Sequence, residues 1–207
     1  MTNHYKIEDG YRIYDLNKSM HYLEKMGKHH FGKHFRIYPE DKDVIHKLLI
    51  YAIQDEESCQ KHNIDLTKGI LLTGPIGCGK TSLMFLLRYF IPPNPGHVMK
   101  AARDVTFEYK TRGHEIILRH AQGTAVFCFD DLGTEQPVKH YGNTCNVMAE
   151  ILLSRYDLYT INKIKTHATT NLNASELEAF YGNRVRSRMR EMFNLIAFDK
   201  GTGDKRK

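Results

Sequence analysis

The chain has 207 residues, a length that suits one well-buried domain with a short appendage. Hydrophobic residues make up 41% and charged residues 26%, the composition of an ordinary globular protein. No apolar run approaches the roughly 18 residues that a membrane span needs, and the N-terminus lacks the apolar segment of a secretion signal. The net charge of +6 favours an acidic partner only mildly.

The four cysteines never have the C-x-x-C spacing of a zinc site, and a disulfide framework is not indicated. Reduced thiols fit the cytosol, so we expect a cytoplasmic protein that does not act at a membrane.

From residue 39 onward, helix and strand patterns alternate along the chain. A stretch that opens at residues 39–41 and carries apolar residues at helical spacing as far as residue 53 predicts a first helix. Short apolar runs predict strands at residues 69–73, 97–101, 124–129, 165–170 and 195–198. Further helical patterns lie at residues 81–90, 105–120, 143–159, 175–181 and 184–193, with a proline-rich loop at 91–96. This alternation predicts an α/β fold, a mostly parallel, doubly wound sheet with helices on both faces.

The two ends of the chain differ from this pattern. Residues 1–38 are rich in His, Lys and Tyr, and Gly27 and Gly32 interrupt any regular periodicity. We interpret them as an N-terminal extension and a candidate partner-binding segment, residues 39–199 as the core domain, and residues 200–207 as a basic tail that frays.

A phosphate-binding motif follows the first predicted strand. The sequence GPIGCGKT at residues 74–81 fits G-x-x-x-x-G-K-[ST] and lies between an apolar strand and an apolar helix. Glycines let successive backbone N–H groups point at one phosphate, and the helix N-terminus adds partial positive charge. The predicted ATP-binding residues are Gly74, Gly77, Cys78, Gly79, Lys80, Thr81 and Ser82. Lys80 would bridge the β- and γ-phosphates, and Thr81 would ligate Mg²⁺.

Two carboxylates end the apolar strand AVFCF. Asp130 is predicted to hold Mg²⁺, and Asp131 to polarise the attacking water. Taken alone, the pair would be better explained as a solvated acidic turn. Its pairing with the phosphate loop favours a nucleotide site instead.

Four segments, at residues 74–81, 130–135, 168–171 and 182–188, occur in an order that resembles the DnaC-like helicase loaders and the related IstB-type transposition helpers, both AAA+ ATPases. The resemblance covers about residues 40–199 and implies an AAA+ core with ATP and Mg²⁺ but no C-terminal lid domain. Many AAA+ proteins have Asp-Glu where this chain has Asp130-Asp131. The general base is therefore open between Asp131 and the nearby Glu135.

The same resemblance assigns two further residues. Asn171 matches the sensor 1 position, although by spacing alone it could equally be a turn residue. Arg188 matches the arginine finger of box VII, which reaches a neighbouring subunit's ATP, with Arg184 as its companion. A solvated basic helix is the alternative for these arginines.

The leading functional hypothesis is an ATP-dependent loader of a replicative helicase that assembles on single-stranded DNA and associates with itself through its ATP sites. The closest alternative is an IstB-type helper of a transposase. A small-molecule P-loop kinase leaves Arg184 and Arg188 without a role. A nucleotide-gated binding module with little hydrolysis also stays open. Basic residues interleaved with aromatic ones could line a DNA path or form a solvated helix face; they are Lys100, Arg103, Phe107, Tyr109, Lys110, Arg112, Arg119 and His120.

Overall fold

A computed structural model describes residues 4–91, 96–140 and 143–206. Its centre is a five-stranded sheet in the order β4-β5-β8-β3-β9, in which every neighbouring pair is parallel. The strands are β3 (Gly69–Thr73), β4 (Val98–Ala101), β5 (Phe127–Leu132), β8 (Thr166–Thr170) and β9 (Phe193–Ala197). The parallel sheet predicted from the alternating pattern is confirmed.

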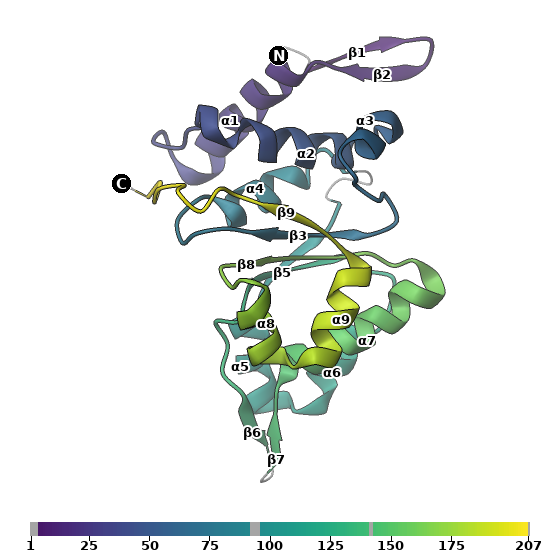
Figure 1. Cartoon of the computed structure of the whole chain (residues 1–207), viewed down its shortest axis with the longest axis vertical. Helices are drawn as coiled ribbons and strands as arrows, with labels where there is room; N and C mark the ends of the chain where they lie inside the picture. Colours follow the sequence, from purple (N-terminus) through teal and green to yellow (C-terminus); the bar gives the residue numbers. More distant parts are fainter. Residues whose placement is uncertain (1–3, 92–95, 141–142, 207) are drawn as a thin grey trace.

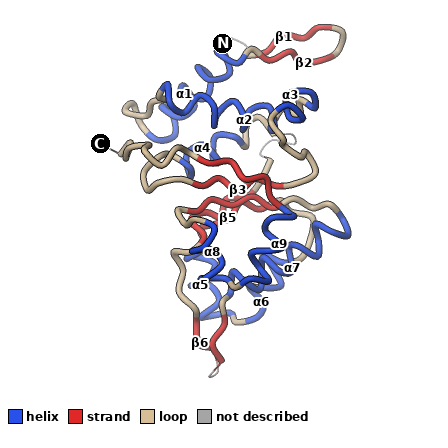
Figure 2. Tube along the Cα trace, viewed as in Figure 1, coloured by secondary structure: helices blue, strands red, loops and turns tan. Residues whose placement is uncertain are grey.

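Helices cover both faces of this sheet (Figure 1). One side carries α1 (Leu16–Phe31), α2 (Lys42–Ala52), α3 (Glu56–Lys61) and α4 (Lys80–Leu87), with a short 3-10 turn at Pro39–Asp41 before α2. The other side carries α5 (Ala102–Arg112), α6 (His114–Ala121), α7 (Val147–Asn162), α8 (Ala174–Tyr181) and α9 (Asn183–Met192). The strands of the five-stranded sheet run through the middle of the molecule, between the two helical layers (Figure 2).

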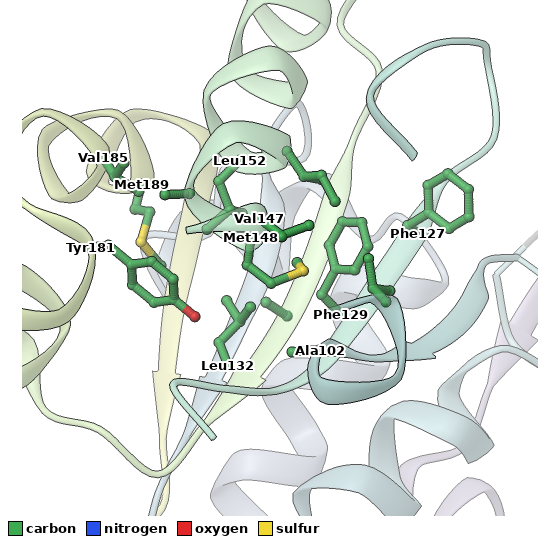
Figure 3. Packing of buried hydrophobic residues seen from close by; sticks show 14 of the residues in the cluster. Ala102, Phe127, Phe129, Leu132, Val147, Met148, Leu152, Tyr181, Val185 and Met189 are labelled. Carbon is green, nitrogen blue, oxygen red and sulfur yellow. The ribbon is translucent and has the colours of Figure 1, made fainter. Parts of the chain in front are cut away.

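The hydrophobic core on the α5–α9 side explains why the sequences of the central strands are continuous apolar runs. Phe129 of β5 and Met148 of α7 are fully buried, and Figure 3 shows their side chains packed among those of α7 and α9. On the opposite side, Ile70, Leu72 and Cys128 belong to a second buried cluster with α2 and α4. Because apolar side chains leave both faces of the same strands, the sheet must be covered on both sides.

Two predicted helices differ from the structure in informative ways. The single helix expected at residues 105–120 is two helices, α5 and α6, because Gly113 has a positive φ of 60° that stops the helix. The helix expected from residue 143 begins at Val147, capped by Asn146, and residues Asn143–Cys145 instead form strand β7, paired with β6 (Val138–His140). Helix α3 was not predicted.

The N-terminal 38 residues are more regular than the sequence indicated. A hairpin of β1 (Tyr5–Glu8) and β2 (Tyr11–Tyr14) precedes α1, which packs against α4 and α2. Gly27 lies inside α1, where the ring of Phe35 occupies the space that a Cβ would take, 2.2 Å from its ideal position. The expectation that Gly27 interrupts regular structure was therefore wrong, since its role is close packing.

Of the predicted loop at 91–96, residues 92–95 lie outside the described residues. Beyond β9, residues 198–206 form no helix or strand. Among the described residues, no helix combines the length and apolar character needed to cross a membrane.

Candidate functional site

The strand order places the predicted motifs side by side. β8 lies between β3 and β5, so the residues that follow or end these three strands share one edge of the sheet. The phosphate loop follows β3, Asn171 follows β8, and Asp130 and Asp131 lie near the end of β5. Carboxyl ends of parallel strands are where doubly wound sheets bind ligands.

The phosphate loop has the backbone that its glycines allow. Gly77 and Gly79 have φ of 79° and 101°, and Gly79 caps α4. At Gly74 an added Cβ would lie 2.7 Å from the Cβ of Phe198, so close packing excludes a side chain there.

Lys80 is 4% exposed and turns back over the loop. Its Nζ donates to the carbonyl oxygens of Gly74 and Pro75, both at 2.8 Å, and to Oδ1 of Asn171. Burial lowers the pKa of Lys80. A buried ammonium whose partners are neutral oxygens fits an anionic ligand, because a phosphate would offer the stronger, charge-assisted bonds.

Thr81 and Asp130 form the centre of the predicted metal site. The Thr81 hydroxyl lies 3.0 Å from both carboxylate oxygens of Asp130. Burial raises the pKa of Asp130, although hydrogen bonds from Thr169 and Thr81 oppose this. A hydroxyl and a desolvated carboxylate at one point form an oxygen donor set of the kind that Mg²⁺ prefers.

A β-bulge sets the two carboxylates. The pairing of β5 with β8 shifts register between Phe129 and Leu132, and Asp131 adopts a φ of 55° within it. A positive φ is strained for a residue other than glycine and persists where the surroundings hold it. Here Thr169 holds it, because its Oγ1 accepts from the Asp131 N–H at 2.9 Å and donates to Asp130 Oδ1 at 2.6 Å.

Thr169 was not predicted as a site residue. It is completely buried within β8, and a threonine in an apolar strand does not by itself indicate a function. The sequence feature that could have indicated Thr169 is its position two residues before Asn171, on the strand that ends between the phosphate loop and the Asp130-Asp131 pair.

Glu135, the alternative general base, lies elsewhere. It is 3% exposed, and its carboxylate accepts from the Gly133 N–H at 2.9 Å and from the Tyr181 hydroxyl. Glu135 does not line the cavity beside the phosphate loop, whereas Asp131 and Asn171 do. The geometry therefore favours Asp131 over Glu135 as the carboxylate that faces a bound nucleotide.

That cavity has a volume of about 230 Å³ and extends well beyond the predicted motifs. Besides residues 77–83, its walls include an apolar and aromatic group that the sequence analysis missed: Phe31, Phe35, Ile37 and Tyr38. Two tail residues, Lys205 and Arg206, also line it. An apolar wall beside a phosphate loop provides a surface on which a flat base can pack.

The predicted finger residues lie on a different surface. Arg184 is exposed on α9, and the Arg188 guanidinium lies 4.8 Å from the ring centroid of Tyr156. Both line a shallow hollow with Ser187 and Glu191, and neither lines the phosphate-loop cavity. Val185 and Met189 bury the opposite side of the helix, as its periodicity predicted.

Comparisons with known proteins bear on the fold alone. The sequence matches no family model and no curated protein. Among solved structures, the DnaC helicase loader is similar with a TM-score of 0.57 at 20% identity, covering 79% of this chain and 92% of that one. A proposed primosome component from Streptococcus pyogenes serotype M3 has a TM-score of 0.55 at 16% identity, covering 80% and 83%.

A third similar structure is the replication initiator DnaA bound to AMPPCP and single-stranded DNA. It has a TM-score of 0.51 at 16% identity and covers 79% of this chain but only 47% of DnaA. The chain therefore has the α/β fold of the DnaC-like AAA+ proteins.

Proposed function

We propose that the chain binds ATP with Mg²⁺ in the cavity beside residues 74–81 and hydrolyses it as an AAA+ ATPase. The observation that carries this proposal is the convergence at one sheet edge of Lys80, the Thr81–Asp130 pair, Asp131 and Asn171. These groups come from three different strands or their following loops. A structural turn would not require all of them to meet at one edge of the sheet.

Each group has a role that its position supports. Lys80 exchanges the carbonyl oxygens of Gly74 and Pro75 for phosphate oxygens, and Thr81 with Asp130 would hold Mg²⁺, which neutralises phosphate charge when bound. Asp131 accepts a proton from the attacking water, and Asn171 orients that water. Thr169 keeps both carboxylates in place through its two hydrogen bonds.

The arginine that stabilises the transferring phosphoryl group is proposed to be Arg188 of a neighbouring copy. Arg188 does not line the chain's own cavity, and it lies on an open hollow of α9. An arginine there completes an active site only if another subunit presents its cavity to it. Self-association through the ATP sites is therefore part of the proposal, as is slow turnover by the isolated subunit.

For the biological setting we propose a DnaC-like loader that acts in DNA replication, delivering a replicative helicase and assembling on single-stranded DNA. The likeness to the DnaC loader and to DNA-bound DnaA supports this setting through the fold. A second support is the surface of α5, where Phe107 is 57% exposed and the Lys110 Nζ lies 4.9 Å from its ring centroid. An exposed aromatic beside a cation suits a stacked base.

Nucleotide binding is tested by titrating a fluorescent ATP analogue with Mg²⁺ into the wild type and Lys80→Ala. We expect the substitution to weaken binding by about 100-fold, because it leaves phosphate charge without a buried cation. Lys61→Ala, an exposed lysine of α3, is the matched control and should bind like the wild type. Equal affinity of Lys80→Ala and wild type would overturn the assignment of the loop.

The loader role is tested by a pull-down against a hexameric replicative helicase and, in parallel, a transposase, each with ATP and single-stranded DNA. Retention of the helicase alone supports the loader, and retention of the transposase alone supports the IstB-type helper. The Lys110→Ala/Phe107→Ala double variant tests the role of α5. If it binds DNA as tightly as the wild type, α5 does not contribute to DNA binding.

A further inference from the structure

The residues after β9 return across the phosphate loop. Because β9 is parallel to β3, its end lies beside the start of the loop, and the Phe198 N–H donates to the Thr73 carbonyl at 2.8 Å. Farther along, the Lys205 N–H donates to the Gly77 carbonyl at 3.1 Å. The expectation that residues 200–207 fray is therefore wrong for the described part of this tail, since Asp204 and Lys205 contact Gly77 of the loop.

A largely buried ion pair fixes the tail. The Lys205 ammonium bonds to Asp41, and their side chains are 14% and 6% exposed. Asp41 also accepts from the Tyr38 N–H at 3.2 Å, which ties the same carboxylate to the aromatic wall of the cavity. The ammonium further lies 5.3 Å from the ring centroid of Tyr38 and 5.2 Å from that of Phe198. Removing one partner would leave a buried charge uncompensated, which is strongly unfavourable.

This Lys205–Asp41 ion pair, referred to below as the latch, sets the position of the next residue, Arg206. Arg206 lines the cavity, and among the described residues its guanidinium has one distant ionic partner, Asp204, with Nε and the carboxylate 4.0 Å apart. Asp204 itself packs against Gly77, where an added Cβ would lie 2.1 Å from its carboxylate oxygen. The tail thus brings a weakly paired cation to the wall of the cavity that the phosphate loop also lines.

We propose that residues 198–206 are part of the nucleotide site: Arg206 binds the phosphates of the chain's own ATP, and the Lys205–Asp41 latch is the positioning element that holds it there. This inference rests on the proposed nucleotide binding at the phosphate loop. An arginine suits the position because its planar, permanently charged group bonds to two phosphate oxygens at once. Contacts from this segment of the same chain would add to the affinity for the phosphates.

The test measures ATP, ADP and adenosine affinities by calorimetry for six forms of the full chain: wild type, Arg206→Ala, Lys205→Ala, Lys205→Arg, the Lys205→Ala/Arg206→Ala double variant, and Lys200→Ala. Lys200 is an exposed lysine of the same tail and serves as the charge-matched control. We expect Arg206→Ala to weaken ATP binding about 10-fold and to leave adenosine binding unchanged. Lys205→Ala should weaken it at least as much, and Lys205→Arg should restore most of the loss.

The double variant decides whether the latch acts through Arg206. If it does, adding Arg206→Ala to Lys205→Ala weakens ATP binding by less than 2-fold, because the arginine is already displaced. Hydrogen exchange of residues 198–206 should rise in Lys205→Ala and stay low in Arg206→Ala. Full additivity, or an Arg206→Ala variant that binds ATP like the wild type, would overturn the proposal. Because Arg206 is exposed, its variant folds even if Lys205→Ala does not.

Failure of this inference is distinct from failure of the proposed function. If Lys80→Ala abolishes ATP binding while all tail variants bind normally, the phosphate loop stands and the tail has no role. If the wild type binds no ATP, both proposals fall together.

Discussion

The phosphate-loop cavity and the arginine surface of α9 differ in how their charges are paired. At the phosphate-loop cavity, Lys80 is buried and the adjacent Asp130 is half-buried, and both have partners within the chain, some of which a ligand can replace. On α9, Arg184 is exposed and Arg188 lies over the Tyr156 ring at an open hollow. In the first region, all the groups proposed to bind ATP come from one chain. In the second region, arginines line an open hollow that is separate from the phosphate-loop cavity.

From this contrast we expect substitutions in the two regions to change different properties, ATP affinity or the rate of hydrolysis. Substitutions in the cavity should change binding or chemistry in each subunit separately. Substitutions on α9 should change chemistry only, and only where two copies meet. The following predictions test that separation in order of decreasing effect.

Arg188→Ala should lower the ATPase rate by about 1,000-fold while ATP affinity stays within 2-fold of wild type, because the side chain meets charge only in the transition state. Steady-state turnover and equilibrium titration measure the two quantities. Arg190→Ala, on the same helix but lining a different groove, is the control and should retain activity. A parallel loss of binding and turnover in Arg188→Ala would place this arginine in the binding site.

Asp131→Asn should slow hydrolysis by about 100-fold and leave ATP bound, since an amide cannot accept the proton of the attacking water. Glu135→Gln is the comparison, because Glu135 is buried against Tyr181 away from the cavity. Its measured rate should remain near that of wild type once folding is confirmed by thermal melting. The reverse pattern, with only Glu135→Gln slow, would make Glu135 the base.

Acid should affect both regions equally by destabilising the sheet that carries them. His97 and His167 are buried with ring centroids 5.0 Å apart. Burial lowers the pKa of His97 to about 4, with Arg88 adding to the effect, and lowers the pKa of His167 well below its usual range. Lys165 and Arg155 are the other cations that disfavour a charged His167.

Since the folded state binds these protons less tightly than the unfolded state, stability is complete above about pH 6.5 and declines as the pH falls toward 4. We expect His97 alone to account for a loss on the order of 2 kcal/mol in the free energy of unfolding between pH 7 and pH 5, measured with urea, and His167 to add to it. His97→Gln should flatten this dependence. A wild-type stability that is constant from pH 7 to pH 5 would contradict the buried neutral pair.

Thr169→Val should have the smallest effect, and the effect should be confined to the phosphate-loop cavity. It removes the hydroxyl that joins Asp130 to the Asp131 N–H, so Mg²⁺-dependent ATP affinity should fall about 10-fold. Thr170→Val is the matched control, because its hydroxyl is equally buried but donates to the Leu132 carbonyl. Similar affinities for the two variants would show that Thr169 does not position the carboxylates.

Sequence periodicity predicted the sheet and its helical layers because buried parallel strands are apolar throughout, as Ile70, Leu72 and Phe129 illustrate. The motif residues were also predictable as a set, since each depends on a local spacing. The strand order that brings Asn171 between Lys80 and Asp130 was implied only by the resemblance to a known family.

What the sequence could not show depends on contacts between distant residues. Lys205 pairs with Asp41 across 164 positions, and no local pattern marks a tail lysine as buried. Gly27 is a helix residue because of the Phe35 ring that packs on it, whereas glycine alone indicates a break. The aromatic wall at residues 31–38 was likewise not predictable, because only the fold shows that its side chains lie beside the phosphate loop.

The most direct test of the account measures ATPase rate per subunit as a function of protein concentration, for wild type, Arg188→Ala and an equal mixture of Arg188→Ala with Asp131→Asn. The account predicts that the wild-type rate rises with concentration, that each variant alone is nearly inactive, and that the mixture recovers part of the activity. Recovery follows because an interface can pair an intact cavity from one copy with an intact arginine from the other. A wild-type rate that does not depend on concentration, with Arg188→Ala as active as wild type, would contradict the shared active site.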